Sequence, residues 1–335
     1  MPDDGTSRDA SPETPRRSPS RLGAWLELLR LPNLFTVPGD PIAGFLLASL
    51  ADLLRGTFVV ISFRPPEKQG NLLTILCCAL ASLFLYMAGL ITNDLFDLEE
   101  DRGERPARPL PSGRIRSQTA VIVAVVFFAL GIISAALAGF ASLLVAGALG
   151  VLILVYNAGA KRVAVLGPLN MGLCRGLSLL IGAAALGAAA LVSPAVLVAA
   201  GGLTLYVASV TLIAAGETTG RLRRWLCWAP SAVAILWVLT LDRIFLPGWP
   251  LTVLGLFLSP LAIILAVGWS FAAWKAAGTP AISGAVGGFL RALLVFQATM
   301  AGFCSLFNEC GFWSAVAFTF ALLVSGLLSR RFYAS

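Results

Sequence analysis

The sequence has no histidine and few charged residues. Only 12% of its 335 residues are charged, whereas 58% are hydrophobic and the mean hydropathy is +0.87. A soluble domain has roughly 25% charged residues. The lack of histidine excludes His-ligated metals, Ser–His catalysis and a histidine proton shuttle. The six cysteines form no Cys-x-x-Cys pair and are expected to be apolar fillers. A soluble core could not bury this much apolar surface, so we expect an integral membrane protein.

Ten apolar stretches are long enough to cross a bilayer core, which needs roughly 20 residues per helix. Prolines near the start of the first stretch predict a break or kink there. The ninth stretch contains Arg291 and Gln297, so nine spans is the alternative count. We therefore predict an all-α fold, a bundle of nine or ten transmembrane helices around a central cavity. The stretches cover residues 23–50, 71–93, 118–139, 141–157, 165–189, 194–216, 225–244, 250–274, 284–307 and 311–329.

The distribution of basic residues predicts the orientation in the membrane. Of the 24 Lys and Arg residues, 18 fall on one side if the chain starts there. By the positive-inside rule both termini are cytoplasmic, which requires an even helix count and favours ten. The net charge of +7 then reflects cytoplasmic loops, and nucleic acid is not an expected partner. We expect a multi-pass protein of the inner cell membrane, with a disordered cytoplasmic tail at 1–21 and a membrane domain at 22–335.

An ordered acidic motif follows the second apolar stretch. Asp94, Asp97 and Asp101 are spaced i, i+3, i+7, and Asn93 precedes Asp97 by four residues. On a helix this spacing places the side-chain oxygens on one face. Clustered carboxylates repel one another unless a cation lies among them, and Mg²⁺ prefers oxygen ligands while leaving room for phosphate. We predict that these four residues bind Mg²⁺, with Asp94 and Asp97 catalytic, rather than form a solvated charge run.

Two basic loops on the same side of the membrane could complete an anion site. The proline-rich loop after the acidic motif carries Arg108 and Arg114, which can hold phosphate bidentately. The loop after the fourth stretch carries Tyr156, Lys161 and Arg162. The two cations there add charge for a diphosphate, with Lys161 also a catalytic candidate, and the Tyr156 ring could face a carbocation. The alternative is an interfacial aromatic beside a positive-inside pair.

Together these motifs resemble the UbiA superfamily of intramembrane prenyltransferases. The acidic motif is similar to that family's first Asp-rich motif, and Arg-Pro-Leu-Pro-Ser-Gly at 108–113 follows it as in the family. Arg30-Leu31-Pro32-Asn33 is similar to the family's first-helix motif. The resemblance covers roughly residues 22–307. More narrowly, residues 156–176 and the tenth helix resemble the EboC-like branch.

The resemblance implies a fold, a cofactor and roles for individual residues. Family members bind a polyprenyl diphosphate through Mg²⁺ held by two acidic motifs, ionise it and pass the prenyl group to an acceptor. Carried over, Asn93, Asp94, Asp97 and Asp101 are the first motif. Arg108, Lys161 and Arg162 hold the diphosphate, and Asn33 lines the pocket.

The sequence departs from the family at the second acidic motif. Residues 215–221 contain one carboxylate, Glu217, where the family has two Asp residues. A second Mg²⁺ is therefore in doubt, and Glu217 and Arg221 are candidate substrate-binding residues. Arg175 lies inside the fifth stretch, where a charge costs at least about 2.5 kcal/mol. One interpretation is that Arg175 is a cation in the pocket that binds a diphosphate or an acidic acceptor. The other is that it forms a buried ion pair, with Glu217 as a candidate partner.

The predicted function is Mg²⁺-dependent transfer of a prenyl group from a prenyl diphosphate to a small acceptor, aromatic or polar. The expected partners are these two substrates and membrane lipid, and the sequence leaves the oligomeric state open. One alternative is a family member that binds an isoprenoid phosphate without transferring the prenyl group. The other is a lipid or metabolite transporter, which usually has paired broken helices in related halves. This sequence shows one such helix.

Overall fold

A computed structural model describes most of the chain, and every regular element in the described part is a helix, as predicted. The tail predicted at 1–21 lies outside the described residues except for Arg21, which begins the first helix. Asn33 and Arg221 also lie outside them, as does the side chain of Glu217. The described residues are 21–30, 34–58, 72–219, 224–245, 253–275, 279–304 and 309–332.

In the described part of the chain, ten helices of at least 17 residues account for the ten apolar stretches. Among the described residues, seven helices are long and apolar enough to cross a membrane, as expected of a multi-pass membrane protein. The stretch with Arg291 is among the seven. The long helices are α3 (Gly39–Phe58), α4 (Leu72–Phe96), α6 (Ser117–Ala138), α7 (Phe140–Ala158), α8 (Leu166–Ala184), α9 (Pro194–Thr219), α10 (Ala229–Phe245), α11 (Val253–Lys275), α12 (Thr279–Phe303) and α13 (Glu309–Phe332).

The break predicted near the start of the first apolar stretch is confirmed. A short helix, α1 (Arg21–Leu28), is followed by turns, and the long helix α3 begins only at Gly39. Pro38 and Pro41 explain the late start, because proline is tolerated in the first turn of a helix and disrupts its interior. At the other end α3 runs on to Phe58, eight residues beyond the end of the predicted stretch at 50. A tight turn at Gly139, whose φ is 149°, joins α6 to α7.

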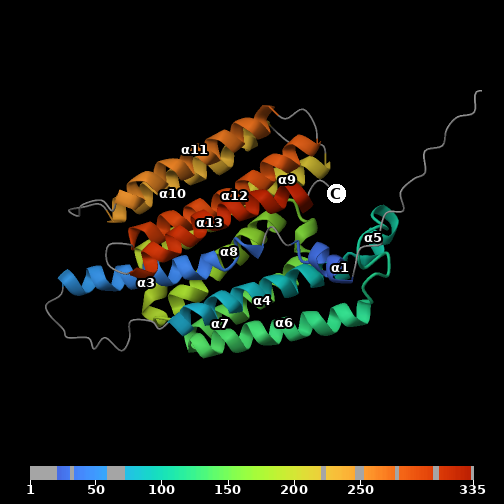
Figure 1. Cartoon of the computed structure of the whole chain (residues 1–335), viewed down its shortest axis with the longest axis horizontal. Coiled ribbons are helices and arrows are strands. Elements are labelled where there is room, and N and C mark those ends of the chain that lie inside the picture. Colours follow the sequence, from blue (N-terminus) through green and yellow to red (C-terminus); the bar gives the residue numbers. More distant parts are fainter. Residues whose placement is uncertain are drawn as a thin grey trace, which may run out of the picture.

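Helices α3 and α8 lie between two groups of helices (Figure 1). On one side are α4, α6 and α7, and on the other are α9 to α13. Helix α8 belongs to both cores: Leu179 and Ala183 pack with α9 and α12, whereas Ile181 packs with α4 and α7. Two apolar cores of the bundle therefore meet at α8.

Small residues let α3 and α8 touch backbone to backbone. A Cβ added at Gly44 would overlap the carbonyl oxygen of Leu179, and one at Gly182 would overlap that of Pro41. Such close approach is how helices associate in lipid, where packing replaces the hydrophobic effect. The contact brings the start of α3 against the C-terminal part of α8, which determines the inner part of the site described below.

The short helix α1 fixes the proline-rich loop at one end of the bundle. Ala24 and Leu28 of α1 are buried against Leu110 and Ile115 of that loop. The loop follows α5 (Leu98–Glu104), which continues from α4. The basic residues of the loop are thereby held beside the end of α4.

Candidate functional site

A cavity of about 180 Å³ opens among α4, α7 and α8. That volume is far more than the roughly 10–15 Å³ needed to hold one water. We call its two ends the mouth, formed by Arg30, Asn93 and Tyr156, and the inner end, formed by Val37, Ser82, Arg175 and Ser178. The remaining lining residues form its walls: Tyr86, Gly89, Leu90, Leu149, Ile153, Asn157, Met171 and Cys174.

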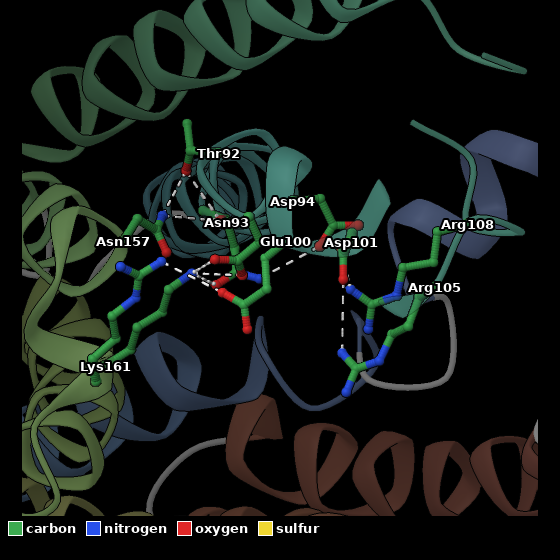
Figure 2. Close-up of polar contacts among 12 residues, drawn as sticks. Thr92, Asn93, Asp94, Glu100, Asp101, Arg105, Arg108, Asn157 and Lys161 are labelled. Carbon is green, nitrogen blue, oxygen red and sulfur yellow. Dashed lines mark hydrogen bonds and ion pairs between the residues drawn. The ribbon is translucent and has the colours of Figure 1, made fainter. Parts of the chain in front are cut away.

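Lys161 occupies the centre of the acidic motif at the mouth (Figure 2). It lies in a short 3₁₀-helix, Ala160–Arg162, that follows α7. Its Nζ is 2.6 Å from both carboxylate oxygens of Asp97 and 3.0 Å from Oδ1 of Asn93. The sequence predicted all three residues as site residues, and the structure brings them together.

The other two predicted carboxylates have separate basic partners. Oδ1 of Asp94 is 3.6 Å from Nη2 of Arg30. Oδ2 of Asp101 is 2.6 Å from Nη1 of Arg108, and its Oδ1 is 3.8 Å from Arg105. The mouth therefore sets four cations against three carboxylates in a row of ion pairs.

The oxygens of the acidic motif suit a hard cation such as Mg²⁺. Among the described residues no three acidic or cysteine side chains converge as a metal site, because each carboxylate faces its own basic partner. The Lys161 ammonium nevertheless shows that Asn93 and Asp97 aim their oxygens at one cationic position. A metal bound there would displace Lys161, which would then be free to contact an anion carried by that metal.

Arg30 has an unusual backbone at the mouth. Its φ is +47°, a left-handed conformation that non-glycine residues rarely adopt. Such strain costs of order 1–3 kcal/mol and is concentrated at functional sites. The strained turn presents the guanidinium of Arg30 to Asp94, so the first-helix motif reaches the cavity through this residue.

The walls of the cavity are mostly apolar, and a hydrogen bond of Asn157 ties two of the helices that form them. Leu90, Leu149 and Ile153 line them together with Tyr86. Asn157 is buried and donates from Nδ2 to Oγ1 of Thr92 at 2.8 Å, which ties α7 to α4. The predicted Tyr156 is at the mouth, where its ring borders the space next to the acidic motif.

At the inner end, Arg175 forms a buried ion pair with Asp40. The Nε of Arg175 is 2.8 Å from Oδ2 of Asp40, and its Nη2 is 3.1 Å from Oδ1. Gln297 of α12 donates to the same Oδ1 at 2.7 Å. The sequence named Glu217 as a candidate partner of Arg175, but the ion pair that the structure shows is with Asp40, on the helix that Gly182 brings close.

Two predicted site residues have ion-pair partners other than Asp94, Asp97 and Asp101. Arg114 forms an ion pair with Glu27 of α1 at 2.8 Å and donates to the carbonyl of Ala107, so it anchors the loop. Arg162 is exposed, 3.5 Å from Glu100.

Sequence reasoning missed several residues that the structure places at the site. The available signals were weak: Asp40 is a lone acid in an apolar stretch, and Asn157 directly follows the predicted Tyr156. Ser82 and Ser178 gave no signal, because serine is common in membrane helices. Arg30 was part of a recognised motif, but the sequence alone did not indicate which of its residues reaches the cavity.

Comparison with known proteins gives a sequence match over the first part of the bundle. Residues 56–217 match the UbiA prenyltransferase family. Digeranylgeranylglyceryl phosphate synthase of Metallosphaera sedula is 33% identical over 161 residues, which are 48% of this chain and 51% of that protein. The enzyme of the same name from Methanocaldococcus jannaschii is 29% identical over 113 residues, 34% of each chain. The matches thus span about a third to a half of the length of these relatives.

Solved structures extend the likeness over most of the chain. A UbiA homologue from Aeropyrum pernix has a TM-score of 0.62 and 19% identity, covering 81% of this chain and 97% of its own. One from Archaeoglobus fulgidus, bound to DMAPP and Mg²⁺, has a TM-score of 0.57 and 17% identity, covering 88% and 99%. At these identities the likeness shows a common fold. This protein therefore has the fold of the UbiA homologues, and its residues 56–217 relate it to the UbiA prenyltransferase family.

Proposed function

We propose that this protein is a membrane prenyltransferase that uses Mg²⁺ to transfer a prenyl group from a prenyl diphosphate to a small acceptor. The observation that carries the proposal is the cation position between Asn93 and Asp97, now held by Lys161, at the mouth of a cavity with apolar walls. A metal–diphosphate pair fits such a position, because the carboxylates would hold the metal and the released Lys161 would hold the diphosphate.

The reaction would separate charge at the mouth. The bond from the prenyl carbon to the diphosphate oxygen breaks with its electron pair on the diphosphate, and the acceptor forms the new bond to that carbon and loses a proton. A bound Mg²⁺ would neutralise charge on the leaving diphosphate. Lys161, Arg30 and Arg108 would bind and orient the same group, which is where the negative charge develops.

The walls would protect the cationic prenyl group from water. Leu90, Leu149 and Ile153 offer no nucleophile, and the Tyr156 ring can stabilise a nearby cation through its π face. The named relatives and the DMAPP-bound homologue support a prenyl diphosphate as donor. The EboC-like branch, the orientation with both termini in the cytoplasm of the inner membrane, and the site roles of Asn33, Glu217 and Arg221 remain predictions.

A second candidate is binding of an isoprenoid diphosphate without transfer. The observation that favours it is the single carboxylate at residues 215–221, where the family has two. The two candidates are separated by incubating purified full-length protein with labelled geranyl diphosphate, with and without Mg²⁺ and a mixture of phenolic and alcohol acceptors. Mg²⁺-dependent labelled product establishes transfer. Binding without product over long incubation establishes the second candidate. If the protein neither binds geranyl diphosphate nor forms labelled product, both candidates are refuted.

A further inference from the structure

We propose that the inner end of the cavity is a separate subsite for the uncharged polar group, a hydroxyl, carbonyl or amide, of a neutral co-substrate. The inference rests on the proposed function, in which that co-substrate is the prenyl acceptor. It assigns the two polar ends of one cavity to two chemical classes: a charged diphosphate at the mouth and a neutral polar group at the inner end.

The two ends are well separated along the bundle. Ser82 precedes Asn93 by eleven residues on α4. At 1.5 Å per residue this places them about 16 Å apart along the helix axis. Mostly apolar side chains lie between them, among them Leu90 and Ile153. A diphosphate bound at the mouth therefore does not reach the inner end, which needs its own ligand or stays unpaired.

The inner end carries no net charge. Arg175 is neutralised by Asp40, whose side chain is 0% exposed, and the other polar groups there are the hydroxyls of Ser82 and Ser178. Transferring a carboxylate or phosphate from water into such a site is costly, because no uncompensated cation repays its desolvation. An uncharged polar group pays much less and can still use the donors that are present. The pairing with Asp40 thus argues against the acidic acceptor that an isolated Arg175 would favour.

The inner end still has hydrogen-bonding capacity. A guanidinium has five N–H donors. The Nε and Nη2 of Arg175 contact Asp40 and the carbonyl of Thr36, whereas among the described residues Nη1 has one contact, a long one of 3.5 Å to Thr36 Oγ1. The Ser82 and Ser178 hydroxyls are 2.5 Å apart, Ser82 also contacts the carbonyl of Val37 at 3.5 Å, and Ser178 hydrogen-bonds the Asp40 carboxylate. Nη1 of Arg175 is therefore the donor that is left for a ligand, and the two hydroxyls offer their oxygen lone pairs as acceptors.

An apolar prenyl tail is a poor occupant for this end. It would cover Arg175 and the two serines without offering them a partner, and each polar group buried unpaired is destabilising. A hydroxyl, carbonyl or amide satisfies them. The inner end therefore selects the acceptor by its polar group, while the apolar walls accommodate its hydrocarbon part.

The test uses two probes of nearly equal shape and different charge, 4-hydroxybenzamide and 4-hydroxybenzoate. Their binding to the purified full-length protein is measured at pH 7 by titration calorimetry, alongside binding of geranyl diphosphate with Mg²⁺. We expect the wild type to bind the amide at least about tenfold more tightly than the carboxylate. The carboxylate lacks the N–H donors of the amide, and its charge meets no uncompensated cation at the inner end. Asp40→Asn leaves Arg175 uncompensated and should reverse or abolish that preference.

Further variants keep the test decisive if Asp40→Asn does not fold. Ser178→Ala should weaken the amide about tenfold and leave geranyl diphosphate affinity unchanged, since it removes one hydroxyl from the inner end only. Ser142→Ala is the matched control, because Ser142 is a buried serine that bonds the Ile181 carbonyl outside the cavity. The control should bind both probes as the wild type does.

Each outcome bears on one proposal. The inner subsite is overturned by any of three results: the wild type does not bind the amide, the wild type binds the carboxylate more tightly, or Ser178→Ala binds the amide with unaltered affinity. If geranyl diphosphate binding persists in those cases, the proposed function stands without it. If the amide binds as expected but geranyl diphosphate does not, the inner subsite is real and the proposed prenyl transfer is wrong.

Discussion

At the mouth of the cavity, the ion pair of Lys161 and Asp97 has side chains that are 13% and 19% exposed, and Arg108 beside it is 29% exposed. At the inner end, Arg175 and Asp40 are 10% and 0% exposed. Solvent and a charged ligand can reach the first set and exchange with its partners. The second is enclosed by α3, α8 and α12. The same kinds of side chain therefore serve as an exchangeable ligand site in one place and as a fixed, neutral framework in the other.

Breaking the inner pair should have the largest effect on stability. Asp40→Leu leaves the Arg175 charge buried and unpaired, and we expect it to lower the free energy of unfolding by about 3–5 kcal/mol. Adding Arg175→Met should restore most of that loss, because it removes the unpaired charge. Thermal unfolding in detergent of the wild type, both single variants and the double variant measures this. Additive losses in the double variant would mean that the two residues are not coupled.

Breaking the mouth pair should affect ligand binding more than the fold. Lys161→Met removes a cation that we place on the diphosphate, so its affinity for geranyl diphosphate with Mg²⁺ should fall by about 1.5–3 kcal/mol. Its stability should change by less than the inner variants do, because Asp97 remains partly solvated. A stable Lys161→Met protein with unaltered diphosphate affinity would remove Lys161 from the site.

The backbone contact that positions the inner end should be sensitive to a single methyl group. Gly182→Ala places a Cβ on the carbonyl of Pro41, and overpacking of this kind costs about 1–3 kcal/mol. The matched control is Gly147→Ala on α7, where a Cβ meets nothing within 4 Å and a stabilisation of about 0.5–1 kcal/mol is expected from helix propensity. Equal melting temperatures of the two variants would contradict the close α3–α8 contact.

The smallest effect is expected at Arg114, which the sequence placed in the diphosphate site and the structure places on Glu27. Arg114→Gln should cost less than about 1 kcal/mol of stability, since the pair is partly exposed. Its geranyl diphosphate affinity, measured under the same conditions as for Lys161→Met, should equal that of the wild type. A loss as large as that of Lys161→Met would return Arg114 to the site.

The mouth was more predictable from sequence than the inner end, for a physical reason. Asn93, Asp97 and their neighbours form a local pattern, and a local pattern on a helix determines which side chains share a face. Tyr156 and Lys161 were found because they follow a recognisable apolar stretch on the same side of the membrane. The ten apolar stretches were likewise found, since lipid imposes a minimum helix length.

The inner end depends on how distant helices pack, which a single sequence does not state. The partner of Arg175 is 135 residues away in the chain, and the choice of Asp40 follows from the contact of α3 with α8. The prolines correctly indicated a break in the first apolar stretch, but they did not show that the long helix α3 begins only at Gly39. The pairing of Arg114 with Glu27 was not predicted for the same reason, since Glu27 lies on a separate short helix.

The central claim is that Asn93 and Asp97 hold a cation that carries a prenyl diphosphate. The most direct test is a Mg²⁺ titration of geranyl diphosphate binding by the wild type, Asp97→Asn and Glu99→Gln. Glu99 is the matched control, because it is an acid two residues away whose side chain is 84% exposed and pairs with Arg102. We predict Mg²⁺-dependent binding in the wild type and Glu99→Gln, and its loss in a folded Asp97→Asn protein. Mg²⁺-dependent binding of equal strength in all three proteins would contradict the claim.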